Sequence, residues 1–118
     1  MSKKSEKEIM ANQIEVLSIV EGFYQSGVLF ALMRLNIFER LGEQSRTVGS
    51  LAEELTTRPD TLARLLNAGV MLKLLETNDG VSYRLTPQCQ AVLLPSAGHH
   101  YLGDWIRLQD EFWHAHLR

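Results

Sequence analysis

The segment from Val28 to Phe38 constrains the fold of this chain more than any other. It reads VLFALMRLNIF, and nine of its eleven residues are apolar. An ordinary surface helix carries one apolar stripe, whereas this helix would be apolar around most of its circumference. A domain of 118 residues has few elements to cover it, so we expect cover from a partner subunit. The alternative is that the segment is the central helix of the domain's own core.

A first helix is predicted before this segment, because Met10, Ile14, Leu17 and Tyr24 recur at helical spacing. Gly22 is interpreted as a joint between the two helices. The polar residues 1–8 are predicted to be a disordered tail, although Ser5 could cap the first helix. Residues 9–118 are predicted to form one domain. The candidate dimer-interface side chains are Ile14, Leu17, Phe23, Val28, Leu29, Phe30, Leu32 and Met33.

The middle of the chain has the capping and turn residues of two short helices followed by a β-hairpin. Ser50 and Glu53 have capping-box spacing, Pro59 suits the first turn of a helix, and Asp79-Gly80 favours a hairpin turn. This order predicts a winged helix-turn-helix in a mainly α fold with a small β-hairpin, flanked by N-terminal and C-terminal dimerisation helices. The expected elements are a strand at 46–48, helices at 51–55 and 59–72, and strands at 74–77 and 81–85.

The last part of the chain predicts two further helices. Thr86-Pro87 opens a short helix that ends near Leu94, and a final helix runs from about Tyr101 to the terminus. Because the chain stops within this pattern, we expect a fragment or a truncated gene product. Large aromatic side chains could line a pocket for a flat substrate, or could be ordinary core and interface material. The candidate pocket-wall residues are Tyr24, Trp105, Phe112 and Trp113.

Composition and charge indicate the cellular environment and exclude some classes of partner. No apolar run approaches the roughly 20 residues of a membrane span, and no signal-type segment follows Met1, so we expect a soluble, cytoplasmic protein without a membrane partner. From Glu8 onward there are nine basic and thirteen acidic residues, which argues against a nucleic-acid partner. Cys89 is the single cysteine and is expected to be a packed or half-exposed thiol, not a nucleophile.

Four passages between about Gly22 and Pro95 together resemble a known domain. They are the helix ALMRLNIFERL at 31–41, TVGSLA at 47–52, the stretch from Pro59 to Glu76, and YRLTP at 83–87. In this order and spacing they resemble the N-terminal dimerisation domain of class I S-adenosylmethionine-dependent O-methyltransferases of plant phenolic and bacterial polyketide pathways. The chain differs from that family at Lys73, where glycine is common.

The resemblance implies a homodimer whose N-terminal helices interlock. It implies a winged helix that serves as scaffold rather than DNA reader, and that helps to wall the substrate pocket, partly in trans. In the family a separate C-terminal Rossmann-like domain binds S-adenosylmethionine and usually carries a histidine base. We expect that domain to be absent from this chain, because the eight glycines are scattered rather than clustered in a cofactor loop.

We therefore expect this chain to hold no catalytic, cofactor-binding or metal residues, with S-adenosylmethionine used only by the parent enzyme. His114 and His116 are two apart on a helix and point to different faces. The predicted function is a dimerisation domain of a small-molecule O-methyltransferase, whose substrate is an aromatic hydroxyl compound bound only with the missing domain. The alternative is a free-standing winged-helix DNA-binding regulator, for which helix 59–72 would present Asp60, Thr61, Arg64 and Asn67.

Overall fold

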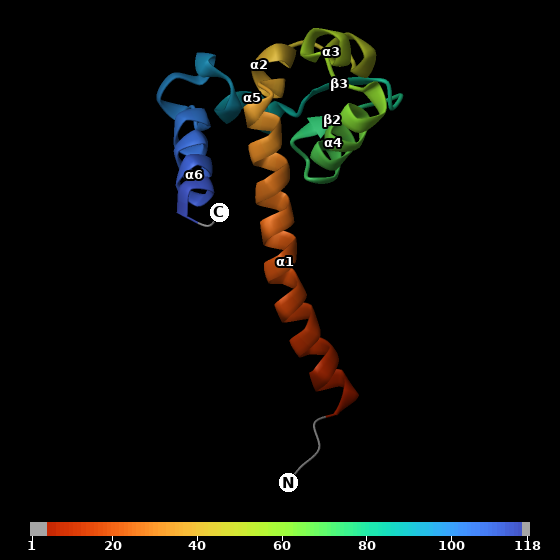
Figure 1. The fold of residues 1–118 in the computed structure, drawn as a ribbon, viewed down its shortest axis with the longest axis vertical. Coiled ribbons are helices and arrows are strands. Elements are labelled where there is room, and N and C mark those ends of the chain that lie inside the picture. Colours follow the sequence, from red (N-terminus) through yellow and green to blue (C-terminus); the bar gives the residue numbers. More distant parts are fainter. Residues whose placement is uncertain (1–4, 117–118) are drawn as a thin grey trace.

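The computed structural model describes residues 5–116 as a mainly helical fold with a small antiparallel sheet (Figure 1). This agrees with the predicted mainly α class. The elements are α1 (Glu6–Arg34), α2 (Ile37–Leu41), β1 (Arg46–Thr47), α3 (Val48–Leu55), α4 (Pro59–Met71), β2 (Leu75–Glu76), β3 (Ser82–Leu85), α5 (Pro87–Leu93), the 3-10 helix η1 (Pro95–His100) and α6 (Gly103–His116).

Helix α1 is continuous, and this corrects two predictions. Gly22 is not a joint, because the helix runs through it to Arg34. The Oγ of Ser5 accepts a hydrogen bond from the Glu8 amide at 3.2 Å, so residues 6–8 are helical and do not belong to a tail; residues 1–4 lie outside the described part. The predicted helix from Val28 to Phe38 is in fact the end of α1 followed by α2, separated at Asn36 by a left-handed φ of 54°.

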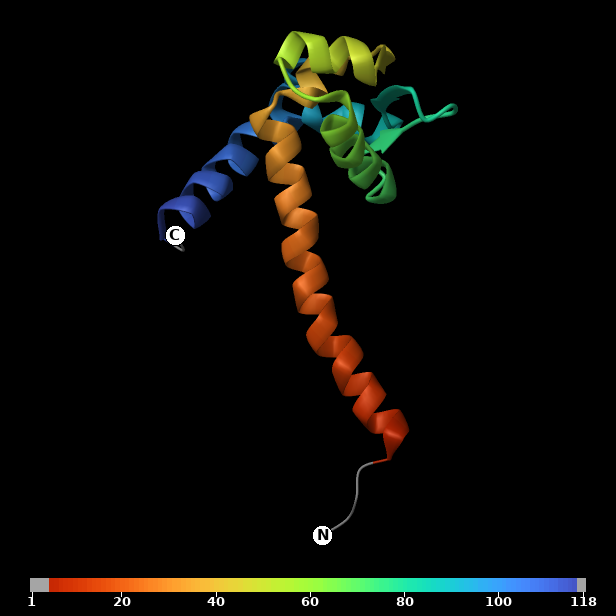
Figure 2. The ribbon, with the colours of Figure 1, turned by 45° about the vertical axis from the view of Figure 1, so that its right-hand side comes forward.

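Helix α1 also gives the molecule an extended shape. Its 29 residues span about 43 Å at 1.5 Å per residue. The radius of gyration is 17.7 Å, against about 13.5 Å for a compact domain of this length. Figures 1 and 2 show why: the C-terminal end of α1 lies in the body formed by α2–α5, and its N-terminal half projects away from that body.

Helices α3 and α4 are joined by a short turn, and each ends in a left-handed residue. The Oγ1 of Thr47 accepts the Ser50 amide at 3.1 Å, so α3 begins earlier than the predicted Ser50–Glu53 capping box. At the end of α4, the Lys73 amide bonds Val70 O and the Leu74 amide bonds Gly69 O, both at 3.0 Å, which is a Schellman motif. Lys73 has φ 63° and thus adopts the conformation that glycine would provide.

The sheet has three strands in the order β1-β3-β2, all antiparallel. The predicted hairpin is present, with shorter strands than expected, and β1 adds to its free edge with Arg46 opposite Tyr83. One carboxylate oxygen of Asp79, Oδ1, accepts the amides of Val81 at 2.9 Å and Ser82 at 2.8 Å. These bonds stabilise the turn and lower the pKa of Asp79.

The core forms where the end of α1 meets α4 and the sheet. A Cβ added at Gly69 would lie 3.0 Å from Leu75 Cδ1 and 3.2 Å from Leu32 Cδ1, so the missing side chain allows α1, α4 and β2 to approach closely. The apolar segment after Val28 therefore belongs to the domain's own core, as the alternative interpretation held. The largest fully buried side chains are Tyr83, Phe38, Leu32, Ile37, Leu51, Leu62, Leu66, Leu75 and Leu85.

Helix α1 is long and apolar enough to cross a membrane, judged by length and composition alone. Its best 18-residue window has a mean hydropathy of 1.5, and 17% of that window is buried. The core helix of a soluble protein and an N-terminal signal sequence meet the same criterion, so one such helix is weak evidence for a membrane span.

Candidate functional site

The outstanding surface feature of the described residues is the N-terminal half of α1. Between residues 9 and 24 it exposes nine large apolar side chains, with exposed fractions from 45% for Ile9 to 80% for Phe23. We call this set the α1 apolar surface. It comprises Ile9, Met10, Ile14, Val16, Leu17, Ile19, Val20, Phe23 and Tyr24.

The α1 apolar surface is both wide and large. At 100° per residue its members cover an arc of roughly 220°, which leaves a narrower polar side that includes Glu15 and Ser18. Together they expose on the order of 1,000 Å², which exceeds the roughly 800 Å² that each partner contributes to a standard protein interface. Contiguous apolar patches of this size mark interaction sites.

The structure divides the predicted interface residues into three groups. Ile14, Leu17 and Phe23 are exposed members of the α1 apolar surface, and Leu29 and Phe30 are half-buried against the core. The predictions for the remaining three are corrected, because their own subunit covers them. They are Val28, Leu32 and Met33, which are at most 7% exposed.

Helix α6 presents a second exposed apolar surface. Ile106 is buried and anchors the helix to the body, while four large apolar side chains of α6 are exposed by about half or more. The rings of Phe112 and Trp113 meet edge to face, with centroids 6.0 Å apart. We call this set the α6 apolar surface; it comprises Trp105, Leu108, Phe112 and Trp113.

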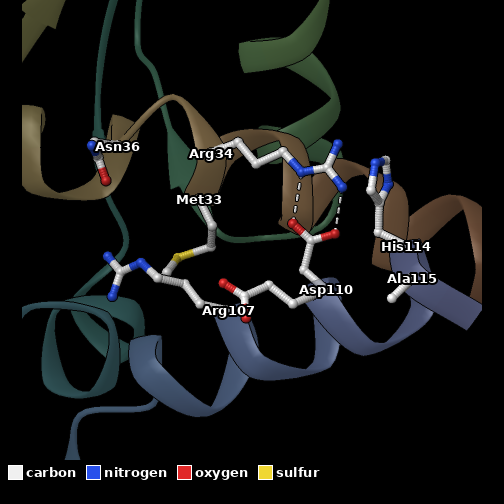
Figure 3. A pocket seen from close by; sticks show the side chains of 8 residues that line it. Met33, Arg34, Asn36, Arg107, Asp110, His114 and Ala115 are labelled. Carbon is white, nitrogen blue, oxygen red and sulfur yellow. Dashed lines mark hydrogen bonds and ion pairs between the residues drawn. The ribbon is translucent and has the colours of Figure 1, made fainter.

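A bidentate ion pair ties α6 to the end of α1. Arg34 donates through Nε to Asp110 Oδ2 at 2.7 Å and through Nη2 to Oδ1 at 2.5 Å (Figure 3). The hydrogen bond to Asp110 raises the pKa of Arg34. A second tie links Arg107 to α2, since Nη2 donates to Glu39 Oε1 at 3.3 Å. The two ties hold α6 beside α1 with space between the helices.

Two hollows lie on either side of the Arg34–Asp110 pair. The first is charged and encloses about 710 Å³; Figure 3 shows its side chains, and Asp110 reaches across it to Arg34. The second, the α1–α6 groove, encloses about 470 Å³ and is mainly apolar. Its lining is Gly22, Phe23, Ser26, Gly27, Phe30, Arg34, Asp110, Trp113 and His114.

The structure brings together only part of the predicted pocket wall. Trp113 lines the α1–α6 groove opposite Phe23, which the sequence placed in the dimer interface. Trp105, Phe112 and Tyr24 are exposed and do not line this groove. The groove was missed because helical periodicity cannot tell which two helices face each other.

Other candidate groups are accounted for within the fold. Cys89 is buried, as expected for a packed thiol. His99 and His100 are exposed, with ring centroids 3.9 Å apart and the ring planes tilted by 44°. Within residues 5–116, no three His, Cys, Asp or Glu side chains are arranged to hold a metal ion. Asn67, a candidate DNA-reading residue, accepts a hydrogen bond from the Tyr83 hydroxyl at 2.6 Å.

The proteins to which this chain is similar include O-methyltransferases. The family model of the O-methyltransferase dimerisation domain matches residues 17–95. Demethylspheroidene O-methyltransferase of Cereibacter sphaeroides is 31% identical over 97 residues, which cover 75% of this chain and 24% of that protein. O-demethylpuromycin-O-methyltransferase of Streptomyces alboniger is 35% identical over 75 residues, which cover 64% of this chain and 20% of that protein.

The solved structures extend the likeness to the fold. The structure of PigF with SAH superposes with a TM-score of 0.73 at 27% identity, over 85% of this chain and 29% of that one. The chain thus spans about a quarter of the length of the curated relatives it matches. Because the family model matches residues 17–95, which is more than half of the chain, the chain belongs to the family of O-methyltransferase dimerisation domains.

Proposed function

We propose that this chain joins two copies of an O-methyltransferase subunit into a homodimer through the α1 apolar surface. The observation that carries the proposal is the exposure of nine large apolar side chains on one projecting helix. Leaving on the order of 1,000 Å² of apolar surface in water is unfavourable by about 25 cal/mol per Å². A second copy presents the same surface and can cover it.

The elements α3, α4, β2 and β3 support the interpretation of the middle of the chain as a winged helix that serves as scaffold. Helix, turn, helix and hairpin follow one another in the required order. The DNA-binding alternative is less favoured. The Asn67 side chain is engaged by Tyr83, and the turn between β2 and β3 presents Asp79, whose carboxylate would repel phosphate.

For the parent enzyme we propose S-adenosylmethionine-dependent methyl transfer to an aromatic hydroxyl compound. The names of the two curated relatives support the O-methyl chemistry, and the PigF structure contains SAH. The chain would contribute part of a wall of the substrate pocket through Trp113, which lines the α1–α6 groove. Titration calorimetry of this chain with S-adenosylmethionine is expected to show no heat of binding, since the eight scattered glycines provide no cofactor loop.

The proposed dimer is tested by light scattering coupled to size-exclusion chromatography at micromolar concentration. The wild-type chain should elute with twice its mass, and Phe23→Glu should elute as a monomer because it buries an unpaired charge. Met71→Glu is the matched control: Met71 is 82% exposed but lies on α4. A folded wild-type monomer at high concentration contradicts the proposal, and recovery of the chain with floated lipid vesicles would favour a membrane instead.

A further inference from the structure

We infer that α6 is a hinged lid on the α1–α6 groove. Its first turn stays fixed to the body, and its last two turns swing away from α1 when the ion pair between Arg34 and Asp110 breaks. The groove then has one fixed wall, α1, and one movable wall, α6. This inference concerns movement within a single subunit and does not rest on the proposed homodimer.

The first turn of α6 is fixed at several points. Ile106 is 5% exposed and packs into the core. The Tyr101 ring lies directly against the backbone of Gly103, where an added Cβ would be 2.0 Å from Tyr101 Oη. That hydroxyl accepts a hydrogen bond from Arg107 Nη1 at 3.0 Å and donates one to Glu39 Oε1 at 3.4 Å. The start of α6 is therefore bound to α2 and serves as the pivot.

The connection that precedes the pivot leaves α6 free to turn. Residues 95–100 follow the buried Leu94 and are exposed, apart from the half-buried Ala97. Gly98 has φ 64° and ψ −126°, a combination that is strained for any residue with a side chain. In Figures 1 and 2 α6 leaves the body at its N-terminal end, and its other end points away from the body. Short exposed connections with small residues are typical hinges.

The ion pair between Arg34 and Asp110 fastens α6 beyond the pivot. The side chain of Arg34 is 55% exposed and that of Asp110 is 14% exposed, so water reaches the pair and can replace its two hydrogen bonds when they break. Pairs of this kind contribute little net free energy. Residues 111–115 of α6 are all exposed. The pair therefore acts as a latch that can open and close while the rest of the fold is unchanged.

Trp113 is the part of the lid that lies over the groove. It follows Asp110 by three residues and thus lies one turn further along the same side of α6. It lines the groove together with Phe23 and Phe30 from α1, yet it remains 49% exposed. Movement of α6 away from α1 uncovers the apolar walls of the groove, and movement toward α1 covers them. The latch consequently controls access to the groove.

Tryptophan fluorescence can follow this movement, because the two tryptophans of the chain lie at opposite ends of α6. Trp105→Phe leaves Trp113 as reporter of the moving end, and Trp113→Phe leaves Trp105 as reporter of the pivot. Asp110→Arg in each background places two cations together and opens the latch. Acrylamide should then quench Trp113 more strongly, and Trp105 as before. Loss of an exposed ion pair raises the open fraction by up to about fivefold.

Charge reversal of the other partner supplies the matched comparison. Arg34→Asp should have the same effect as Asp110→Arg, and the double variant should restore the original quenching of Trp113, because the pair forms again with its charges exchanged. Glu111→Arg makes the same charge change at the exposed neighbouring residue and should leave the quenching unchanged. Asp110→Asn removes the charge with little change in shape and gives the same comparison with less disturbance of the fold.

The outcomes decide between a hinged lid and a fixed or detached helix. Circular dichroism and light scattering first establish that each variant is folded and has the oligomeric state of the wild type. Unchanged quenching of Trp113 in the folded Asp110→Asn and Asp110→Arg variants overturns the inference. Equal increases for Trp105 and Trp113 also overturn it, because the whole helix would then leave the body instead of turning about its first turn.

Discussion

At the scale of single residues, two helix ends adopt a conformation that their side chains do not favour. Thr56 ends α3 with φ 53° and Lys73 follows α4 with φ 63°. Left-handed φ is strained for a residue with a Cβ, most of all for a β-branched one. The hydrogen bonds of both turns, such as Thr57 N to Ala52 O at 3.0 Å, hold the strained residues in place.

We predict that Thr56→Gly stabilises the chain by about 1 kcal/mol, because glycine adopts positive φ without a steric penalty. Urea unfolding followed by circular dichroism at fixed protein concentration measures the change. Thr57→Gly, one residue on and without a positive φ, is the control and should stabilise nothing. Equal effects of the two substitutions would show that the strain at Thr56 is absent.

Acidification should weaken the hairpin turn. The amides of Ser82 and Val81 hold the pKa of Asp79 below its ordinary value of 3.8. A carboxyl group with a lowered folded-state pKa stabilises the fold above its unfolded-state pKa, and this contribution is lost as pH falls through the folded-state pKa. Asp79→Asn should therefore be less stable than wild type at pH 7, and the difference should shrink below pH 3.8. A pH-independent difference in urea midpoint would contradict the assignment.

Several local features of this kind follow from the sequence, but the choice between two candidate N-caps of α3, Thr47 and Ser50, does not. Pro59, the Asp79-Gly80 turn and the Ser5 cap are found where their chemistry predicted them. Thr47 and Ser50 are both good helix caps, and Glu53 favoured the second. The choice of Thr47 depends on pairing of β1 with β3 and on the bond from Val48 N to Val81 O at 2.9 Å, which lies far away in sequence.

At the scale of elements, the largest misreading concerns the apolar segment at the end of α1. Its composition correctly predicted that it must be covered on several sides. Composition does not tell whether the cover comes from the same chain, and here α4 and β2 approach closely enough to bury Leu32 completely. The close approach depends on Gly69. The helical pattern of apolar residues does not reveal that this position must lack a side chain.

Gly69→Val should destabilise the chain by about 1–3 kcal/mol, because a branched side chain would push Leu75 and Leu32 apart in a packed core. Gly49→Val is the matched control, since a Cβ at Gly49 meets nothing within 4 Å. Denaturant unfolding compares the two variants. If Gly69→Val is no worse than Gly49→Val, the packing of α4 against α1 is looser than described.

The ion pair between α1 and α6 should control how firmly α6 is held. Asp110→Ala removes both bonds from Arg34, and we expect faster hydrogen exchange of the α6 amides with a global stability loss of at most about 1 kcal/mol, as for exposed ion pairs. Glu111→Ala is the control on the same helix, since Glu111 is exposed and lies next to Asp110. Unchanged exchange in Asp110→Ala would show that Ile106 and the Arg107–Glu39 tie are enough to hold α6.

At the scale of the whole molecule, the sequence predicted a chain with more apolar surface than it can bury. In the structure that exposed apolar surface lies nearer the N-terminus than predicted. The excess lies on residues 9–24 instead of 28–33, because the body covers the C-terminal end of α1 and none of its N-terminal half. Periodicity alone predicted helices in both places. Only the three-dimensional arrangement shows which helix remains without cover.

If self-association provides that cover, stability must depend on concentration. Folded dimer that unfolds to two separate chains gains stability from mass action, so the Tm of the wild-type chain should fall on tenfold dilution. Phe23→Glu should have a lower Tm that no longer changes with dilution, whereas Met71→Glu should behave as wild type. Differential scanning fluorimetry over a hundredfold range measures all three. A wild-type Tm that is independent of concentration would mean that the projecting half of α1 is stable in water without a partner.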